Sequence, residues 1–138
     1  MRLLVLLPAA AALLLASTAG GAAPAVKASL TATTSTPVVD EPWRWTVVVK
    51  DAKGKPLRAK MKLQILFGTL VVGCWKGTAM TQCTRASPGT WIRFKGKRTG
   101  TLTWPAESVG SKLRFQAVVV ASGKTLKLRA PVTVRAKA

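Results

Sequence analysis

The chain has 138 residues, with 22 lysines and arginines against 4 acidic residues, 2 cysteines and no histidine. This length fits one ordinary domain behind a short leader and leaves no room for a second domain. The lack of histidine removes the commonest general base and the usual imidazole zinc ligand, and a formal net charge of +18 favours anionic partners.

The first 23 residues predict a cleavable secretory signal peptide. Arg2 precedes an apolar run from Leu3 to Ala16, and small residues follow this run. This is the layout of an export leader, and the run is short for a membrane-spanning helix. We therefore expect residues 24–138 to form a single domain. We also expect this domain to be secreted to the extracellular space or the cell envelope, with no membrane span after processing.

Two-residue alternation predicts β-strands through most of the remaining chain. β-branched and aromatic residues alternate with polar ones between turns that contain Gly, Pro or Lys-Gly. The expected strands, in chain order, are 26–34, 43–50, 59–67, 69–75, 90–95, 101–105, 112–122 and 124–136. Seven to eight strands at this spacing predict an all-β fold, an immunoglobulin-like β-sandwich.

The alternation also predicts which side chains point inward. In the second strand the tryptophans and valines at odd positions share one face, and in the third Met61, Leu63, Ile65 and Phe67 do so. Residues 51–56 and 96–100 are expected to form turns. The predicted core includes Trp45, Val47, Leu63, Ile65, Ile92, Phe94, Leu102, Trp104, Phe115 and Val132.

Two segments carry a family resemblance. The first segment has a strand, then Asp, a small residue and a Gly-Lys-Pro turn, then a second strand: "WTVVVKDAKGKPLRAKMKLQI". The second has a Gly-initiated strand, a proline-containing connection and an alternating strand: "GTLTWPAESVGSKLRFQAVV". This order resembles the bacterial immunoglobulin-like domains of the invasin and adhesin type. The resemblance implies the fold and export, and it carries over no catalytic residue. Such domains usually occur in tandem arrays, whereas this chain has one copy.

The two cysteines, Cys74 and Cys83, predict a structural disulfide. A zinc site normally needs four nitrogen or sulfur ligands, and a thioredoxin-like redox pair needs cysteines separated by two residues beside a helix. An even number of cysteines close together in an exported chain is typical of a disulfide instead. We therefore expect residues 74–83 to be closed into a loop.

Two interpretations of this loop stay open. In one, Trp75, Lys76 and Met80 form a rigid binding protrusion, which makes the protein an adhesin-like protein–protein interaction module that docks a surface protein. In the other, Trp75 covers the edge of the core.

The sequence predicts no catalytic, cofactor or metal site. The four carboxylates are those of Asp40, Glu41, Asp51 and Glu107. The first two are adjacent, so their side chains point to opposite faces of an extended segment, and the other two lie in expected turns, where capping is the ordinary role. A non-enzymatic protein is therefore predicted.

Basic residues alternate with core residues in several predicted strands. In an immunoglobulin-like sandwich the third strand and the last two share a sheet, so one face is expected to collect a candidate polyanion-binding set: Lys60, Lys62, Lys112, Arg114, Lys127 and Arg129. Its partners would be wall teichoic acid, acidic polysaccharide, anionic lipid head groups or extracellular nucleic acid. The alternative is a charged surface that only maintains solubility and protects sheet edges. We expect a binding or structural module at or near the cell envelope.

Overall fold

Nine strands and one short 3₁₀ turn make up the part of the chain that the structure describes. The computed structural model describes residues 25–76, 79–83 and 89–138, so the expected signal peptide lies outside the described residues. The elements are β1 (Val26–Ala32), β2 (Pro42–Asp51), β3 (Arg58–Phe67), β4 (Leu70–Lys76), β5 (Ala79–Thr81), β6 (Ile92–Lys95), β7 (Lys97–Thr103), η1 (Ala106–Ser108), β8 (Lys112–Ala121) and β9 (Lys124–Thr133).

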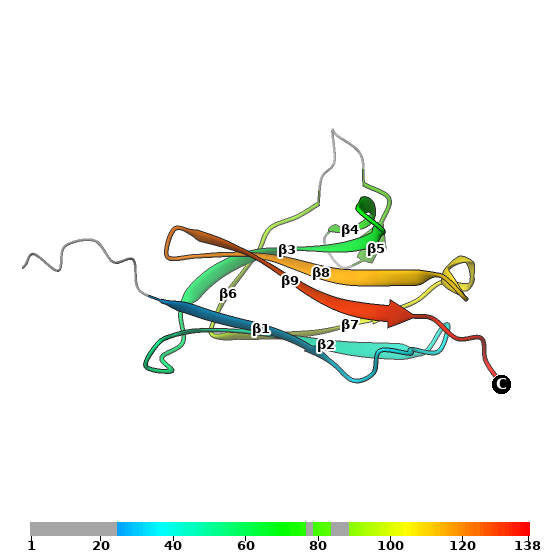
Figure 1. Ribbon diagram of the computed structural model, residues 1–138, viewed down its shortest axis with the longest axis horizontal. Coiled ribbons are helices and arrows are strands. Elements are labelled where there is room, and N and C mark those ends of the chain that lie inside the picture. The colour runs from blue at the N-terminus through cyan, green and yellow to red at the C-terminus, as the bar shows by residue number, and fades with distance from the viewer. Residues whose placement is uncertain (1–24, 77–78, 84–88) are drawn as a thin grey trace, which may run out of the picture.

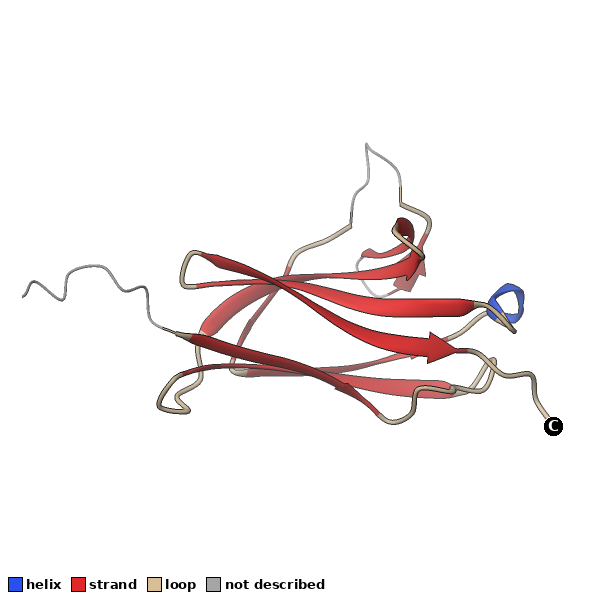
Figure 2. Ribbon diagram, in the orientation of Figure 1, coloured by secondary structure: helices blue, strands red, loops and turns tan. Residues whose placement is uncertain are grey.

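The strands form two antiparallel sheets that face each other (Figure 1, Figure 2). The smaller sheet has the order β1-β2-β7, and the larger has the order β5-β4-β3-β8-β9, with β6 also paired to β3. The predicted all-β sandwich is therefore confirmed, including the placement of β3, β8 and β9 in one sheet. The strand count exceeds the expected seven to eight because residues of the disulfide loop pair with β4 as the additional strand β5.

The core between the sheets is built around four aromatic residues. The ring of Trp43 meets those of Trp104 and Phe115 edge to face, with centroids 5.3 and 5.1 Å apart, and the Trp45 ring lies 6.0 Å from Phe115. The Nε1–H of Trp43 donates a hydrogen bond to the Thr34 carbonyl at 2.8 Å. Most predicted core residues are buried, while Ile92 and Phe94 are half-buried and pack against the core from its rim.

The turn between β2 and β3 forms as predicted. One carboxylate oxygen of Asp51 accepts hydrogen bonds from the backbone N–H groups of Lys53 and Lys55, at 2.8 and 2.9 Å. Gly54 has a φ of +82°, which glycine adopts without strain. This turn connects β2 in the smaller sheet to β3 in the larger sheet.

The predicted turn at residues 96–100 is wrong. Only Gly96, with a φ of +73°, forms a corner, and Lys97–Thr103 is strand β7, paired with β2. At Gly96 the chain leaves the larger sheet and enters the smaller one. A Cβ atom here would lie 2.5 Å from the Cβ of Pro56, so only glycine fits the corner.

Phe67 does not join the core with the other inward residues of β3. Its side chain is 56% exposed, whereas that of Leu66 is 4% exposed. The pairing of β3 with β4 shifts between Ile65 and Leu66, so that Val72 has no partner, and Phe67 lies past this bulge at the end of the strand. Strand alternation alone cannot reveal where a strand extends beyond the core.

Within the residues that the structure describes, no helix has both the length and the apolar character needed to cross a membrane.

Candidate functional site

The outer surface of the larger sheet collects basic side chains from four strands. We call this surface the basic face, and it consists of Lys60, Lys62, Arg93, Lys112, Arg114, Lys127 and Arg129. These positions alternate with the core positions of β3, β6, β8 and β9, so their side chains point away from the core. The structure thus places all six basic candidates from the sequence on one face and adds Arg93, which is the direct partner of Lys60.

The sheet register determines how these charges are spaced. Lys62 is opposite Val118, which is in turn opposite Lys127, so two lysines flank one valine across three strands. Neighbouring strands lie about 4.8 Å apart, and side chains two residues apart on a strand are about 6.6 Å apart. Positive charges therefore recur at short intervals both along and across the strands.

A row of hydrogen bonds crosses the middle of the basic face. The amide nitrogen of Gln116, whose side chain is buried, donates to the amide oxygen of Gln64 at 2.8 Å. The Nε–H of Arg129 donates to the amide oxygen of Gln116 at 2.7 Å. This row fixes Arg129 on the sheet while using only one of the five N–H donors of a guanidinium group.

Trp91 is the aromatic residue of the basic face and precedes β6. Its side chain is 38% exposed, and the Nζ atoms of Lys60 and Lys62 each lie 4.5 Å from its ring centroid. An ammonium group at this distance is attracted by the negative face of an indole ring. The arrangement brings two positive charges to one partly exposed aromatic surface.

No carboxylate lies in the four strands that make the basic face. Asp40 and Glu41 precede β2, Asp51 ends it, and Glu107 is in η1. The positive charges of the basic face are therefore not neutralised by acidic side chains of the same strands.

A shallow hollow of about 540 Å³ lies at one end of the basic face. Four basic side chains line it, from the start of β3 and from β6: Arg58, Lys60, Arg93 and Lys95. Because like charges gather around a concave surface, the hollow is suited to an anionic group.

The predicted disulfide is present. Cys74 and Cys83 are bonded, with Cα atoms 5.4 Å apart, and they join β4 to the residues after β5. Trp75 and Met80 are direct partners in the β4–β5 hairpin, and both pack against the rim of the core. Of the candidate loop contacts, Lys76 is exposed.

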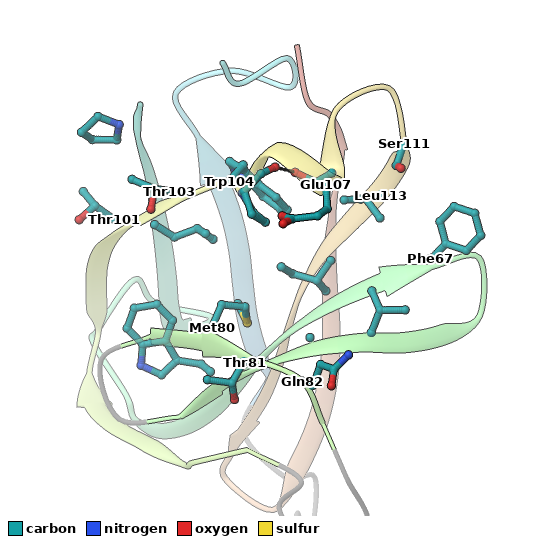
Figure 3. Close-up of a pocket in the computed structure, with 18 residues that line it drawn as sticks. Phe67, Met80, Thr81, Gln82, Thr101, Thr103, Trp104, Glu107, Ser111 and Leu113 are labelled. Atoms are coloured by element: carbon teal, nitrogen blue, oxygen red, sulfur yellow. Dashed lines mark hydrogen bonds between the residues drawn. The ribbon is translucent and has the colours of Figure 1, made fainter. Parts of the chain in front are cut away.

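A second concave region, of about 840 Å³, lies between the β4–β5 hairpin and β7 (Figure 3). Apolar side chains from both sheets line most of it, Trp75 and Met80 among them. The amino-acid pattern does not predict this cavity, because Trp75 and Met80 have the alternation of ordinary core positions. Among the residues that the structure describes, no group of three Asp, Glu, His or Cys side chains is placed to hold a metal ion.

Comparison with known proteins gives no family assignment. No protein-family model matches the chain, and no curated protein matches it. Among solved structures, the chain is similar to the CARDB domain of a Pyrococcus furiosus protein in complex with di-metal ions, with 14% identity and a TM-score of 0.48 over 83% of this chain and 96% of that one. It is also similar to part of the Pseudomonas fluorescens alkylpurine DNA glycosylase AlkC bound to DNA, with 12% identity and a TM-score of 0.39 over 81% of this chain and 31% of that one.

Proposed function

We propose that this protein is a non-enzymatic, secreted binding module that holds polyanions on the basic face, at or near the cell envelope. The observation that carries the proposal is the gathering of seven basic side chains on four strands that contain no carboxylate. Closely spaced positive charges attract a chain of negative charges, and the attraction releases bound counterions.

The spacing of the charges favours a repeating anion over a single small one. An anionic polymer can contact several basic side chains at once, because they recur in two directions over the sheet. Wall teichoic acid, acidic polysaccharide, anionic lipid head groups and extracellular DNA share this chemistry. Trp91 adds an exposed ring on which a sugar or a base can stack, which favours a polymer that contains such rings.

A non-enzymatic role agrees with the available side chains. The chain has neither histidine nor tyrosine, and the Asp51 carboxylate already accepts two backbone hydrogen bonds in a turn. Secretion is supported by the predicted leader and by the disulfide, since disulfides persist in oxidising compartments.

The alternative, a protein-interaction module that uses the disulfide loop 74–83, has less support from the geometry. Trp75 and Met80, the two residues expected to anchor a partner, pack toward the core instead of projecting from the hairpin.

Heparin affinity chromatography tests the proposal with two matched triple variants. The first, K60Q/K62Q/K127Q, removes three charges from the basic face. The second, K27Q/K50Q/K97Q, removes three from the outer surface of the smaller sheet, where Lys27 and Lys50 are direct partners and Lys97 lies on the neighbouring strand. Both variants have the same net charge, so only the position of the lost charges differs.

We expect the first variant to elute at a clearly lower salt concentration than the wild type and the second to elute near the wild type. Equal shifts would mean that net charge alone causes retention and would overturn the assignment to the basic face. Elution of the wild type below about 0.2 M salt would show that there is no polyanion site, because several simultaneous charge contacts hold a polyanion well above that concentration.

A further inference from the structure

Two pairs of like charges line the shallow hollow at one end of the basic face. Arg58 is the direct partner of Lys95, and Lys60 is the direct partner of Arg93, where β3 pairs with β6. These four side chains surround a volume of about 540 Å³. Like charges directly opposite each other destabilise a sheet, so each pair opposes the pairing of the two strands.

No acidic side chain of the surrounding strands offsets the four charges. The sequences of β3, β6 and β8 contain neither Asp nor Glu. β3 begins and β8 ends at the same end of the larger sheet (Figure 1), and residues 120–122, which have short side chains, also line the hollow. An anion in this space would be attracted by both pairs at once.

The spacing of the four cations suits one compact anion with more than one charge. Residues directly opposite on antiparallel strands have Cα atoms about 4.5–5.5 Å apart, and residues two positions apart on a strand are about 6.6 Å apart. Long side chains at the corners of so small a rectangle can converge on one group. A phosphomonoester has a charge of about −1.5 to −2 at pH 7 and three acceptor oxygens, and an arginine can donate two parallel hydrogen bonds to it. The hollow therefore favours a phosphomonoester over a sulfate ester, which has one negative charge.

The rest of the surface indicates which kind of molecule carries the phosphate. The apolar side chains that could enter a bilayer, those of Phe67, Leu70 and Val72, lie at and after the end of β3, whereas the hollow lies where β3 begins. Single-stranded nucleic acid is held by successive bases that stack on several aromatic side chains. The described part of the basic face offers one such side chain, Trp91. A saccharide needs neither feature.

We propose that the hollow binds the phosphomonoester groups of a phosphorylated polysaccharide. This inference rests on the proposed function, because the saccharide chain beyond the phosphate would lie on the basic face. It adds a preference for a dianionic group over a monoanionic one. Lys60 links the hollow to a natural reporter, since its Nζ atom lies 4.5 Å from the centroid of the Trp91 ring.

An NMR titration of the ¹⁵N-labelled protein tests this preference. The probes are glucose 6-phosphate and glucose 6-sulfate, which share the sugar ring, and the backbone amides of β6 and the Trp91 indole report binding. The second pKa of a phosphomonoester is about 6, so the phosphate is mainly dianionic at about pH 7.5 and mainly monoanionic at about pH 5. The chain has no histidine, which is the side chain that ordinarily titrates in this range, so a change in relative affinity comes from the ligand.

At about pH 7.5 we expect glucose 6-phosphate to bind at least about fivefold more tightly than glucose 6-sulfate, because the additional charge meets four solvent-exposed cations. At about pH 5 the two dissociation constants should agree within about twofold, since both ligands then have one charge. Equal affinities at the higher pH, or a ratio that does not change with pH, would overturn the proposal. Thymidine 5′-phosphate should bind no more tightly than glucose 6-phosphate. Tighter binding of the nucleotide would overturn the assignment to a saccharide in favour of a nucleic acid.

Two matched double variants locate the site. R58Q/K95Q removes one like-charge pair from the hollow and leaves the basic face intact, whereas K62Q/K127Q removes two charges of the basic face that do not line the hollow. The net charge of the two variants is the same. R58Q/K95Q should be at least as stable as the wild type, because it relieves a repulsion between direct partners.

R58Q/K95Q should lose the preference for phosphate over sulfate, and its elution from heparin should change less than that of K62Q/K127Q. The latter variant should keep the preference. Retention of the preference by R58Q/K95Q, or its loss in K62Q/K127Q, would contradict the proposed location. If K62Q/K127Q eluted early from heparin while the wild type showed no preference for phosphate, the polyanion function would stand and the inference about the hollow would fall.

Discussion

Gly100 provides the space that Trp45 occupies in the core. It lies on β7, directly opposite Trp45 on β2. A Cβ atom at this position would overlap the Cζ2 atom of the indole ring and would lie 2.8 Å from Cε2. Since Trp45 is itself buried against Phe115, the ring has little room to move away.

Gly100→Ala should therefore lower the free energy of unfolding by about 1–3 kcal/mol, which is the usual cost of overpacking. Urea unfolding followed by tryptophan fluorescence would measure the change. Thr101→Ala, at the exposed neighbouring position, is the control and should stay within about 0.5 kcal/mol of the wild type. If the two variants had equal midpoints, Trp45 would have space that the structure does not show.

Gly100 shows which property of a single residue the sequence alone does not predict. Alternation correctly placed Trp45 and Phe115 inside, because that pattern is local. It could not identify the strand that faces Trp45, so Gly100 was assigned to a turn. Phe67 followed the same alternation, but whether an inward residue is covered depends on neighbouring strands.

The β4–β5 hairpin depends on its disulfide more than on its strand pairing. β5 has three residues, and it is the edge strand of the larger sheet. So short a strand contributes few ladder hydrogen bonds and little buried surface. The bond between Cys74 and Cys83 reduces the freedom of the unfolded loop and so favours the hairpin.

Cys74→Ala/Cys83→Ala should lower the free energy of unfolding by roughly 2.5–3 kcal/mol, as the chain-entropy model gives for so short a loop. Urea unfolding under non-reducing conditions would measure the loss. Amide hydrogen exchange should become faster at Met80 and Thr81 than in the wild type, with little change at Val119 in the centre of β8. The wild type in reducing agent is the control and should match the variant. Unchanged exchange at Met80 would mean that strand pairing alone holds the hairpin.

At this scale, the sequence predicted most elements and their order correctly. Turn residues such as those at 51–56 have local chemistry, so they could be located. The corner at Gly96 could not be distinguished from a turn, because both need a glycine with positive φ. The difference lies in Pro56, which packs against Gly96 from a distant part of the sequence.

Over the whole molecule, excess positive charge opposes the compact state. The chain has a formal net charge of +18, and the basic face concentrates part of it. Self-repulsion among such charges is larger in the folded protein than in the expanded chain.

Raising NaCl from about 0.01 to about 0.1 M shortens the Debye length from about 30 to about 10 Å, so the free energy of unfolding should increase. Urea midpoints at the two salt concentrations would measure this. K60Q/K62Q/K127Q should gain less from the added salt than the wild type does, since it has fewer charges to screen. A salt response of the same size in both proteins would show that repulsion on the basic face is unimportant for stability.

The sequence predicted the basic face but not the cavity. The basic face could be predicted from the alternation of basic and core residues. The only further rule needed is that the third strand and the last two share a sheet in an immunoglobulin-like sandwich. The cavity depends on the distance between β4 and β7, which belong to different sheets and are far apart in the chain.

The two ends of the described domain also determine how it bears mechanical force. β1 starts at one end of the long axis, β9 finishes at the other, and the two strands run in the same direction (Figure 1). Each is hydrogen-bonded to an antiparallel neighbour, β1 to β2 and β9 to β8. Because those bonds are perpendicular to the strands, tension between the ends would shear whole ladders at once instead of opening them rung by rung. A pull along the length of the sandwich would therefore load the β1–β2 and β8–β9 ladders in shear.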